Sequence, residues 1–241
     1  KRLLVLMPQL PYPPRQGTAI RNYNLLSYLA KHHTVHLLTF YEAPSQLQEA
    51  RPLWELCERV EAVPAPSRTL FQRALALFLS PLPDMALRLA SPLLQERLEA
   101  MVRENDYDAV HVEGIEMARY GLWILEHRDG SRPVVAFGDQ NAEYLLQRRA
   151  FETDIRSLRR WVGAFYSFVQ WQKLARYEAL ICRRADNVVA VSEADRDALR
   201  KLVPDLDVIV VPNAVDVDYY ASFRLTSPPI TPWSPHSLVF T

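Results

Sequence analysis

The segment NVVAVSEAD (residues 187–195) is a β-branched run that ends in a serine and two acidic residues. It predicts a buried strand at Asn187–Val191 and a helix at Glu193–Leu202, with Ser192 as the helix N-cap. A second apolar run, Val208–Val211, predicts the next strand. Short, mostly uncharged strands on either side of a helix are typical of a parallel sheet with both faces covered.

The same alternation of strand and helix extends toward the N-terminus. Further candidate strands lie at Leu3–Leu6, Val35–Thr39, Val60–Val63, Ala109–Val112 and Val134–Phe137. Candidate helices lie between them, at Thr18–Lys31, Ser45–Cys57, Ser67–Leu79, Pro92–Glu104 and Glu116–His127. The chain is therefore predicted to be an α/β protein with a Rossmann-like, doubly wound parallel sheet of about seven strands.

Residues 141–184 interrupt this alternation, because they contain no strand signal and Gly163 is their only glycine or proline. They predict one long helix or two in succession. Four aromatic residues recur at helical spacing in the second part: Trp161, Phe165, Phe168 and Trp171. The pattern predicts a buried helical face. The alternative is an amphipathic surface that meets a membrane or a partner, which is favoured by the preceding Arg148, Arg149, Arg156, Arg159 and Arg160.

Composition and charge exclude several classes of protein. The 28 basic and 28 acidic residues balance, so no global electrostatic attraction to nucleic acid exists. The two cysteines, Cys57 and Cys182, support neither a metal site nor a disulfide framework and indicate a reducing compartment. Neither a signal peptide nor a transmembrane segment is predicted. We therefore expect a cytoplasmic protein that is at most peripheral to the inner face of a membrane.

The composition changes near the C-terminus. Four prolines lie among serines and threonines in residues 225–235, which predicts a linker. A new apolar run then begins at Leu238. We therefore expect residues 1–224 to form one domain, and residues 225–241 to be a proline-rich linker and the start of a further domain.

Ligands of an open parallel sheet bind at the carboxyl ends of its strands, so residues that follow the strands are candidate site residues. The loop after the first strand runs from Pro8 through Gln9 to Gly17 and Thr18, where a helix begins. Gly17 lets a ligand approach the backbone, and unpaired N–H groups at a helix N-terminus favour an anion. Arg21, one turn later, is placed to reach a phosphate. The alternative is an ordinary loop with Gly17 or Thr18 as the helix cap and a solvated Arg21.

Polar side chains also follow the fourth and fifth strands. Glu113 ends the fourth strand and is a better candidate than His111, since a histidine inside a strand is usually a core residue. Four polar side chains follow the fifth strand: Asp139, Gln140, Asn141 and Glu143. A turn needs only one or two such residues, so this group indicates a functional site.

Several common catalytic motifs are missing from the sequence. It contains no GxGxxG fingerprint, no GxSxG elbow, no Walker loop and no HExxH pair. These absences disfavour a dehydrogenase of the dinucleotide type, an α/β-hydrolase, a P-loop enzyme and a zinc peptidase.

Two motifs near the C-terminus identify a resemblance to a known family. They are VVAVSEAD (188–195) and IVVPNAVD (209–216), the second followed by Tyr219 and Tyr220. Three further segments agree with it, GTAIRNYNLL (17–26), DQNAEY (139–144) and LVFT (238–241). Together they resemble the N-terminal domain of family 4 glycosyltransferases, which have the GT-B architecture.

The resemblance implies that this domain holds the acceptor, while a C-terminal domain that is missing here holds most of a UDP- or GDP-sugar donor. Transfer in such enzymes takes place between the domains, usually with retention and without a metal ion or other cofactor. The implied donor-phosphate contacts are Gly17 and Thr18, and the implied catalytic residues are Asp139 and Gln140. The implied acceptor contacts are Gln9, Arg21, Glu113, Asn141 and Glu143. The expected acceptor is a glycan or a lipid-linked molecule of polysaccharide or cell-envelope synthesis.

Three positions depart from the family pattern. Gln16 replaces the first of two adjacent glycines, Gln140 replaces a histidine and Ala214 replaces a glycine. The first change narrows the space beside a phosphate, and the second removes a side chain that would contact the transferred sugar. Two alternatives therefore stay open: a non-catalytic ligand-binding module with this fold, and an enzyme similar to a sugar-nucleotide epimerase. We expect the chain alone, without a donor half, to be inactive.

Overall fold

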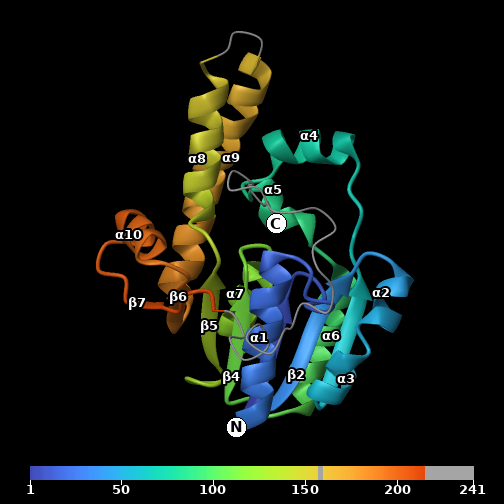
Figure 1. The fold of residues 1–241 in the computed structure, drawn as a ribbon. Helices are drawn as coiled ribbons and strands as arrows, with labels where there is room; N and C mark the ends of the chain where they lie inside the picture. Colours follow the sequence, from blue (N-terminus) through green and yellow to red (C-terminus); the bar gives the residue numbers. More distant parts are fainter. Residues whose placement is uncertain (157–159, 215–241) are drawn as a thin grey trace, which may run out of the picture.

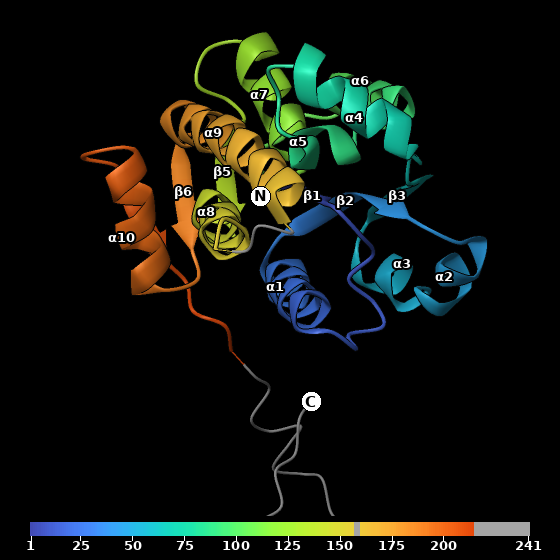
Figure 2. The ribbon, with the colours of Figure 1, turned by 90° about the horizontal axis from the view of Figure 1, so that it is seen from above.

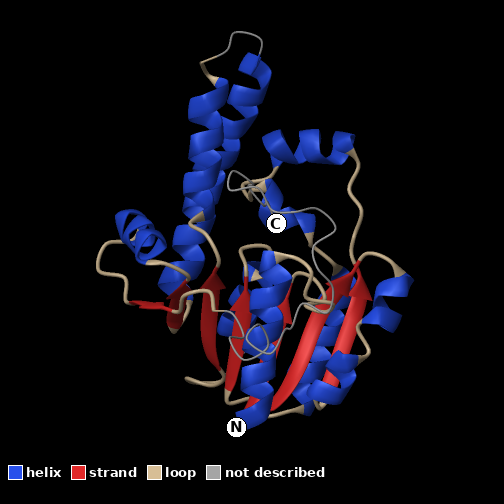
Figure 3. Cartoon of the chain, viewed as in Figure 1, coloured by secondary structure: helices blue, strands red, loops and turns tan. Residues whose placement is uncertain are grey.

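A computed structural model describes residues 1–156 and 160–214 of the chain as a parallel sheet covered by helices (Figure 1, Figure 3). The strands are β1 (Arg2–Met7), β2 (Thr34–Tyr41), β3 (Arg59–Pro64), β4 (Ala109–Glu113), β5 (Val134–Asp139), β6 (Asn187–Ala190) and β7 (Val208–Val210). All neighbouring strands are parallel, in the order β3-β2-β1-β4-β5-β6-β7. All seven predicted strands are confirmed. The order reverses between β1 and β4, which makes the carboxyl ends of these two strands the expected ligand site.

The two faces of the sheet bury different side chains because successive residues of a strand point to opposite sides. In β1, Leu4 and Leu6 belong to the core that also holds side chains of α6 (Pro92–Glu104), α7 (Ala118–His127), α9 (Trp161–Arg184) and α10 (Glu193–Leu202). Val5 and Met7 pack on the other face with α1 (Gly17–His32) and α3 (Pro52–Leu56). Figure 2 shows these two helical layers from above. Double coverage explains why the strands are apolar along their whole length.

Two predicted helices differ from those in the structure. The helix expected at Ser45–Cys57 is two short helices, α2 (Pro44–Glu49) and α3. Pro52 causes the break, because it lacks the N–H that a continuous helix would need. The helix expected from Ser67 begins later, as α4 (Leu70–Leu79), because Thr69 and Gln72 form a capping box. A further short helix, α5 (Asp84–Arg88), was not predicted.

The segment 141–184 forms two helices, α8 (Glu143–Asp154) and α9, as one of the two predicted possibilities. They lie side by side and rise beyond the carboxyl edge of the sheet (Figure 1). The prediction of a buried aromatic face is wrong for Trp161, Phe165 and Phe168, which are exposed. Other residues of α9, such as Ala164 and Leu174, are buried instead, and Leu174 belongs to the main hydrophobic core.

The predicted linker and following apolar run, residues 225–241, lie outside the described residues, as do the last ten residues of the predicted domain 1–224. Within residues 1–156 and 160–214, no helix has the length and apolarity needed to cross a bilayer.

Candidate active site

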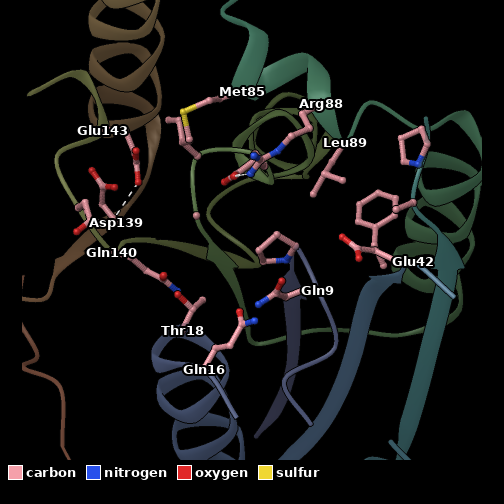
Figure 4. Close-up of a pocket in the computed structure, with 18 residues that line it drawn as sticks. Gln9, Gln16, Thr18, Glu42, Met85, Arg88, Leu89, Asp139, Gln140 and Glu143 are labelled. Atoms are coloured by element: carbon pink, nitrogen blue, oxygen red, sulfur yellow. Dashed lines mark hydrogen bonds and ion pairs between the residues drawn. The ribbon is translucent and has the colours of Figure 1, made fainter. Parts of the chain in front are cut away.

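A cleft of about 560 Å³ lies at the carboxyl ends of the central strands (Figure 4). Gln9 follows β1 in this cleft, Glu116 follows β4, and Gln140 follows β5. The N-terminal residues of α1 and the side of α5 complete its lining through Thr18 and Arg88. The cleft therefore spans the point at which the strand order reverses, where open α/β sheets bind their ligands.

Six of the nine site residues expected from the sequence line the cleft. They are Gln9, Thr18, Asp139, Gln140, Asn141 and Glu143. The other three, Gly17, Arg21 and Glu113, are not among the residues that line it. Segments that are far apart in the sequence thus meet here because the strand order brings them to one edge.

The N-terminus of α1 borders the cleft without a side-chain cap. Its N-cap is Gln16, rather than Gly17 or Thr18, and no side chain in the described part of the chain accepts a hydrogen bond there. A Cβ atom on Gly17 would meet no other atom within 4 Å. Open space therefore lies beside Gly17 at the start of α1, where a ligand can approach the backbone.

A buried hydrogen-bond network lies beneath the cleft around Glu113, which is fully buried. His111 Nε2 lies 2.6 Å from Glu113 Oε2, and Gln140 Nε2 donates to Glu113 Oε1 at 2.7 Å. Burial alone would raise the pKa of Glu113, but His111, Gln140 and the more distant Arg21 outweigh it and hold the pKa below its usual value. Glu113 is therefore an ionised, acceptor-only group at neutral pH.

The charge of Glu113 determines the orientation of the Gln140 side-chain amide. An ionised carboxylate accepts hydrogen bonds only, so the –NH₂ end of Gln140 has to face it. The same Nε2 also donates to Asn22 Oδ1 at 3.1 Å. Both N–H groups of Gln140 are thus used below the cleft. Its Oε1 is left as the polar atom for a ligand, and it favours a hydroxyl group over an anion.

Arg21 connects α1 to the segment that follows β7. Its Nη1 donates to Val211 O at 3.1 Å and to Asn213 Oδ1 at 2.9 Å. Its Nε lies 3.9 Å from Glu113 Oε1. These hydrogen bonds of the Arg21 guanidinium hold the segment that follows β7 against α1.

Asp139 borders the cleft, but its carboxyl oxygens are buried and have no hydrogen-bond partner in the described part of the chain. Burial, together with the nearby carboxylates of Glu178, Glu143 and Asp195, raises the pKa of Asp139 well above its usual value. Glu178 lies on α9 and accepts from the backbone N–H groups of Glu143 and Tyr144 at 2.8 and 2.9 Å. It therefore holds the first turn of α8 in place, a role that nothing in the local sequence indicated.

Glu143 is the titratable side chain of the cleft whose pKa lies near neutrality. Burial raises the pKa to about 7, and the hydrogen bond from Asn141 opposes this shift. A carboxyl with such a pKa exchanges its proton at physiological pH, which suits proton transfer to or from a hydroxyl.

The raised pKa of Glu143 predicts a pH-dependent effect on stability. Protonated Glu143 stabilises the fold fully below about pH 4.5, and this contribution is lost as the pH rises through about 7. Glu143→Gln is therefore expected to increase the free energy of unfolding by about 1–2 kcal/mol at pH 8 and to leave it unchanged at or below about pH 4. Denaturant unfolding at both pH values measures this. Glu152→Gln, at an exposed position of α8, should show no such pH dependence.

Several further residues that line the cleft were not expected from the sequence, among them Glu42, Met85, Arg88 and Glu116. Glu42 directly follows β2, so its place at a strand end was a signal that could have identified it. Arg88 lies on the unexpected helix α5 and forms an ion pair with Glu116. In residues 1–156 and 160–214, no group of three or more His, Cys, Asp or Glu side chains is arranged to hold a metal ion.

Comparison with known proteins shows the family of the chain. The model of the family described as Glycosyltransferase Family 4 matches residues 15–219. Apo UGT2 from Phytolacca americana has a similar structure, with a TM-score of 0.50 and 13% identity over 92% of this chain and 54% of that one. The N-terminal domain of trehalose-6-phosphate phosphatase from Candida albicans has a TM-score of 0.46 and 11% identity, over 90% and 50% of the two chains. The chain spans about half the length of these two structures. No curated protein matches the sequence.

Proposed function

Because this chain belongs to glycosyltransferase family 4, we propose that it forms the acceptor-side half of an enzyme that transfers a sugar from a nucleotide-sugar. The donor would be a UDP- or GDP-sugar, and the acceptor a glycan or a lipid-linked molecule of polysaccharide or cell-envelope synthesis. The observation that carries the proposal is the polar cleft at the reversal of strand order. The Rossmann-like sheet expected from the sequence is confirmed, and open α/β sheets bind their ligands where the strand order reverses.

The N-terminus of α1 is the proposed contact for the donor phosphates. It has no side-chain cap, the space beside Gly17 is open, and Thr18 borders the cleft. The positive end of the helix dipole and the unpaired N–H groups favour an anion at this place. A second domain would supply the rest of the donor site. We accordingly propose that the chain alone is inactive.

The opposite wall of the cleft is the proposed acceptor and sugar site. Gln9, Asn141 and Glu143 offer hydrogen-bonding groups there, and Gln140 offers its Oε1 to a sugar hydroxyl. Glu143, with a pKa of about 7, is the group best suited to take a proton from an acceptor hydroxyl. Asp139, whose carboxyl oxygens are buried, would not contact the sugar through them. We also propose that transfer retains the configuration of the sugar, needs no metal ion and takes place on the cytoplasmic side of a membrane. These points rest on the family resemblance.

Substitution of Gln140 tests the proposal. In the natural protein that contains this chain, Gln140→Leu is expected to lower kcat/KM for sugar transfer by about tenfold or more, because it removes both the hydroxyl acceptor and a partner of Glu113. Release of UDP or GDP from the corresponding nucleotide-sugars provides the assay. Gln48→Leu, on the exposed surface of α2, is the matched control.

Two results would contradict the proposed function. The first is efficient release of nucleotide by the isolated chain, since the donor half is then not needed. The second is a natural protein that transfers no sugar from any UDP- or GDP-sugar, which would favour a ligand-binding module. Restoration of transfer in that protein by Gln16→Gly and Gln140→His would show instead that these two positions limit the activity.

A further inference from the structure

A second cavity, of about 320 Å³, adjoins the active-site cleft on the side of α2. Gln9, Gln16 and Glu42 line both, so the cavity and the cleft are contiguous. The lining continues along the loop after β1 and onto α2 with four further polar side chains: Tyr12, Arg15, Gln46 and Glu49. We call this space the α2 cavity. Its volume lies near the lower end of the range for ligand pockets, about 300–1,000 Å³, so it suits one small unit of a larger ligand.

Gln16 lies where the cleft and the α2 cavity meet. It is the N-cap of α1, with an extended backbone (φ −119°, ψ 154°) that a side chain adopts without strain. Figure 4 shows its side chain pointing into the cleft, toward that of Gln9. Since the family pattern has a glycine at residue 16, this chain differs by carrying an exposed side-chain amide there. That amide can donate and accept hydrogen bonds toward a ligand that crosses from the cleft into the α2 cavity.

Gln46 presents its side-chain amide to the α2 cavity in a fixed orientation. Its Oε1 accepts hydrogen bonds from the backbone N–H groups of Glu42 and Ala43, at 2.7 and 3.2 Å. The carbonyl end is therefore bound to the start of α2, and the –NH₂ end is the group for a ligand. A donor held in this way loses little side-chain freedom when a ligand binds.

Tyr12 adds aromatic surface to the α2 cavity. Its ring packs on that of Tyr23 of α1, with the ring centroids 5.3 Å apart and the planes inclined by 59°. Tyr12 is half-buried, so this contact fixes the ring while part of it stays exposed. An aromatic ring with a hydroxyl offers an apolar face and a polar edge. A sugar ring has the matching properties, since its faces carry C–H groups and its rim carries hydroxyl groups.

The charges of the lining disfavour an anionic ligand. Arg15 Nη2 lies 3.5 Å from Glu49 Oε2, and Glu42 then leaves one negative charge in excess in the α2 cavity. In the neighbouring cleft, Arg88 is paired with Glu116. A phosphate or carboxylate in the α2 cavity would therefore meet a like charge and lose hydration without a compensating cation. A neutral ligand with many hydroxyl groups meets hydrogen-bond donors and acceptors instead.

We propose that the α2 cavity binds a sugar unit, and that the acceptor is therefore a neutral oligosaccharide or the neutral end of a longer glycan. The terminal unit would lie in the cleft, where Gln140 Oε1 and Glu143 are available to the hydroxyl that receives the sugar. The next unit would pass Gln16 and lie against Tyr12 and Gln46. This inference rests on the proposed function for the role of the glycan as acceptor, whereas the binding of the glycan does not require sugar transfer.

Binding of defined sugars to the full 241-residue chain tests the proposal. The probes are an array of neutral di- to hexasaccharides of hexoses, deoxyhexoses and N-acetylhexosamines, together with their monosaccharides and their phosphorylated counterparts. We expect at least one neutral oligosaccharide to bind about tenfold or more tightly than its terminal monosaccharide, because two units contact the protein instead of one. Its phosphorylated counterpart should bind more weakly. Calorimetry of the tightest-binding oligosaccharide then gives the Kd.

Substitutions in the α2 cavity should weaken the binding of that oligosaccharide. Gln46→Glu keeps an acceptor oxygen for the backbone N–H groups at the start of α2 and replaces the –NH₂ donor, so the Kd should rise about tenfold. Tyr12→Leu and Gln16→Ala should each raise the Kd about threefold to fivefold, through loss of the ring and of the amide. Gln48→Glu and Tyr28→Leu are the matched controls, since both residues are exposed and lie outside this lining.

Hydrogen exchange of individual amides locates the bound sugar. The backbone N–H groups of Glu42 and Ala43 donate to Gln46, so a ligand that immobilises Gln46 should slow their exchange. The oligosaccharide is expected to slow this exchange by about threefold or more, and its terminal monosaccharide to leave it unchanged.

Four results would overturn the proposal. They are that no neutral oligosaccharide binds, that the terminal monosaccharide binds as tightly, that the phosphorylated counterpart binds more tightly, or that Gln46→Glu and Tyr12→Leu both bind like the wild type. The third result would favour a phosphate-bearing acceptor. Failure of the proposed function gives a different result: the natural protein releases no nucleotide from UDP- or GDP-sugars, while glycan binding and its dependence on Gln46 persist.

Discussion

Gly138→Ala is expected to lower the free energy of unfolding by about 2–3 kcal/mol, because a buried charged hydrogen bond beneath the cleft would be broken. Gly138 pairs with Glu113 across β5 and β4. A Cβ atom at residue 138 would lie 2.5 Å from Glu113 Oε2 and 3.0 Å from His111 Cε1. Since Glu113 Oε2 is held at 2.6 Å from His111 Nε2, the carboxylate could move only by giving up that bond. Chemical denaturation at pH 7 measures the loss.

The same exchange at Gly17 provides the control. A Cβ atom there would meet nothing within 4 Å, so Gly17→Ala should leave stability unchanged or raise it slightly. If the contact with Glu113 is the cause, the cost of Gly138→Ala should fall sharply when Glu113→Ala is already present. Equal costs in the two backgrounds, or equal stability of the Gly138 and Gly17 variants, would refute this explanation.

Glu178→Ala is expected to lower the free energy of unfolding by about 3 kcal/mol, because two backbone N–H groups at the start of α8 would lose their acceptor in a buried environment. These are the N–H groups of Glu143 and Tyr144, which both donate to the Glu178 carboxylate. The first turn of α8 would then lose its position, and with it the Glu143 side chain in the cleft. Thermal and denaturant unfolding measure the loss of stability.

Glu178→Gln distinguishes the effect of the hydrogen bonds on stability from the effect of the charge. It fills the same space and keeps one acceptor oxygen, so it should cost about 1 kcal/mol, clearly less than the alanine variant. Asp139→Asn should be neutral or stabilising at pH 8, because it removes one of two neighbouring buried carboxyl groups whose pKa values are both raised. An alanine variant as stable as the glutamine variant would show that Glu178 does not hold the start of α8.

The sequence predicted the fold well but the cleft only in part. All seven strands and the helices α1, α6 and α10 follow from local apolar patterns and caps, such as Ser192 Oγ, which accepts from Asp195 N at 3.1 Å. The strand-end rule likewise identified six residues that line the cleft. It missed Arg88, because α5 is too short to leave a periodic signal. It also assigned a buried face to Trp161 and Phe165, since helical spacing does not say which side of a helix meets the core.

Local patterns in the sequence alone therefore determined the class of fold, the parallel strands and the residues that end each strand. These properties depend on neighbours within one or two turns of chain, which is why periodicity and caps predict them. Only the tertiary structure decided which of those residues meet. Gln140 is oriented by Asn22 and Glu113, from strands and helices distant in the sequence, and Glu178 reaches the start of α8 from another helix. Such contacts depend on the order of strands in the sheet and on the desolvation of charged groups, which no local pattern encodes.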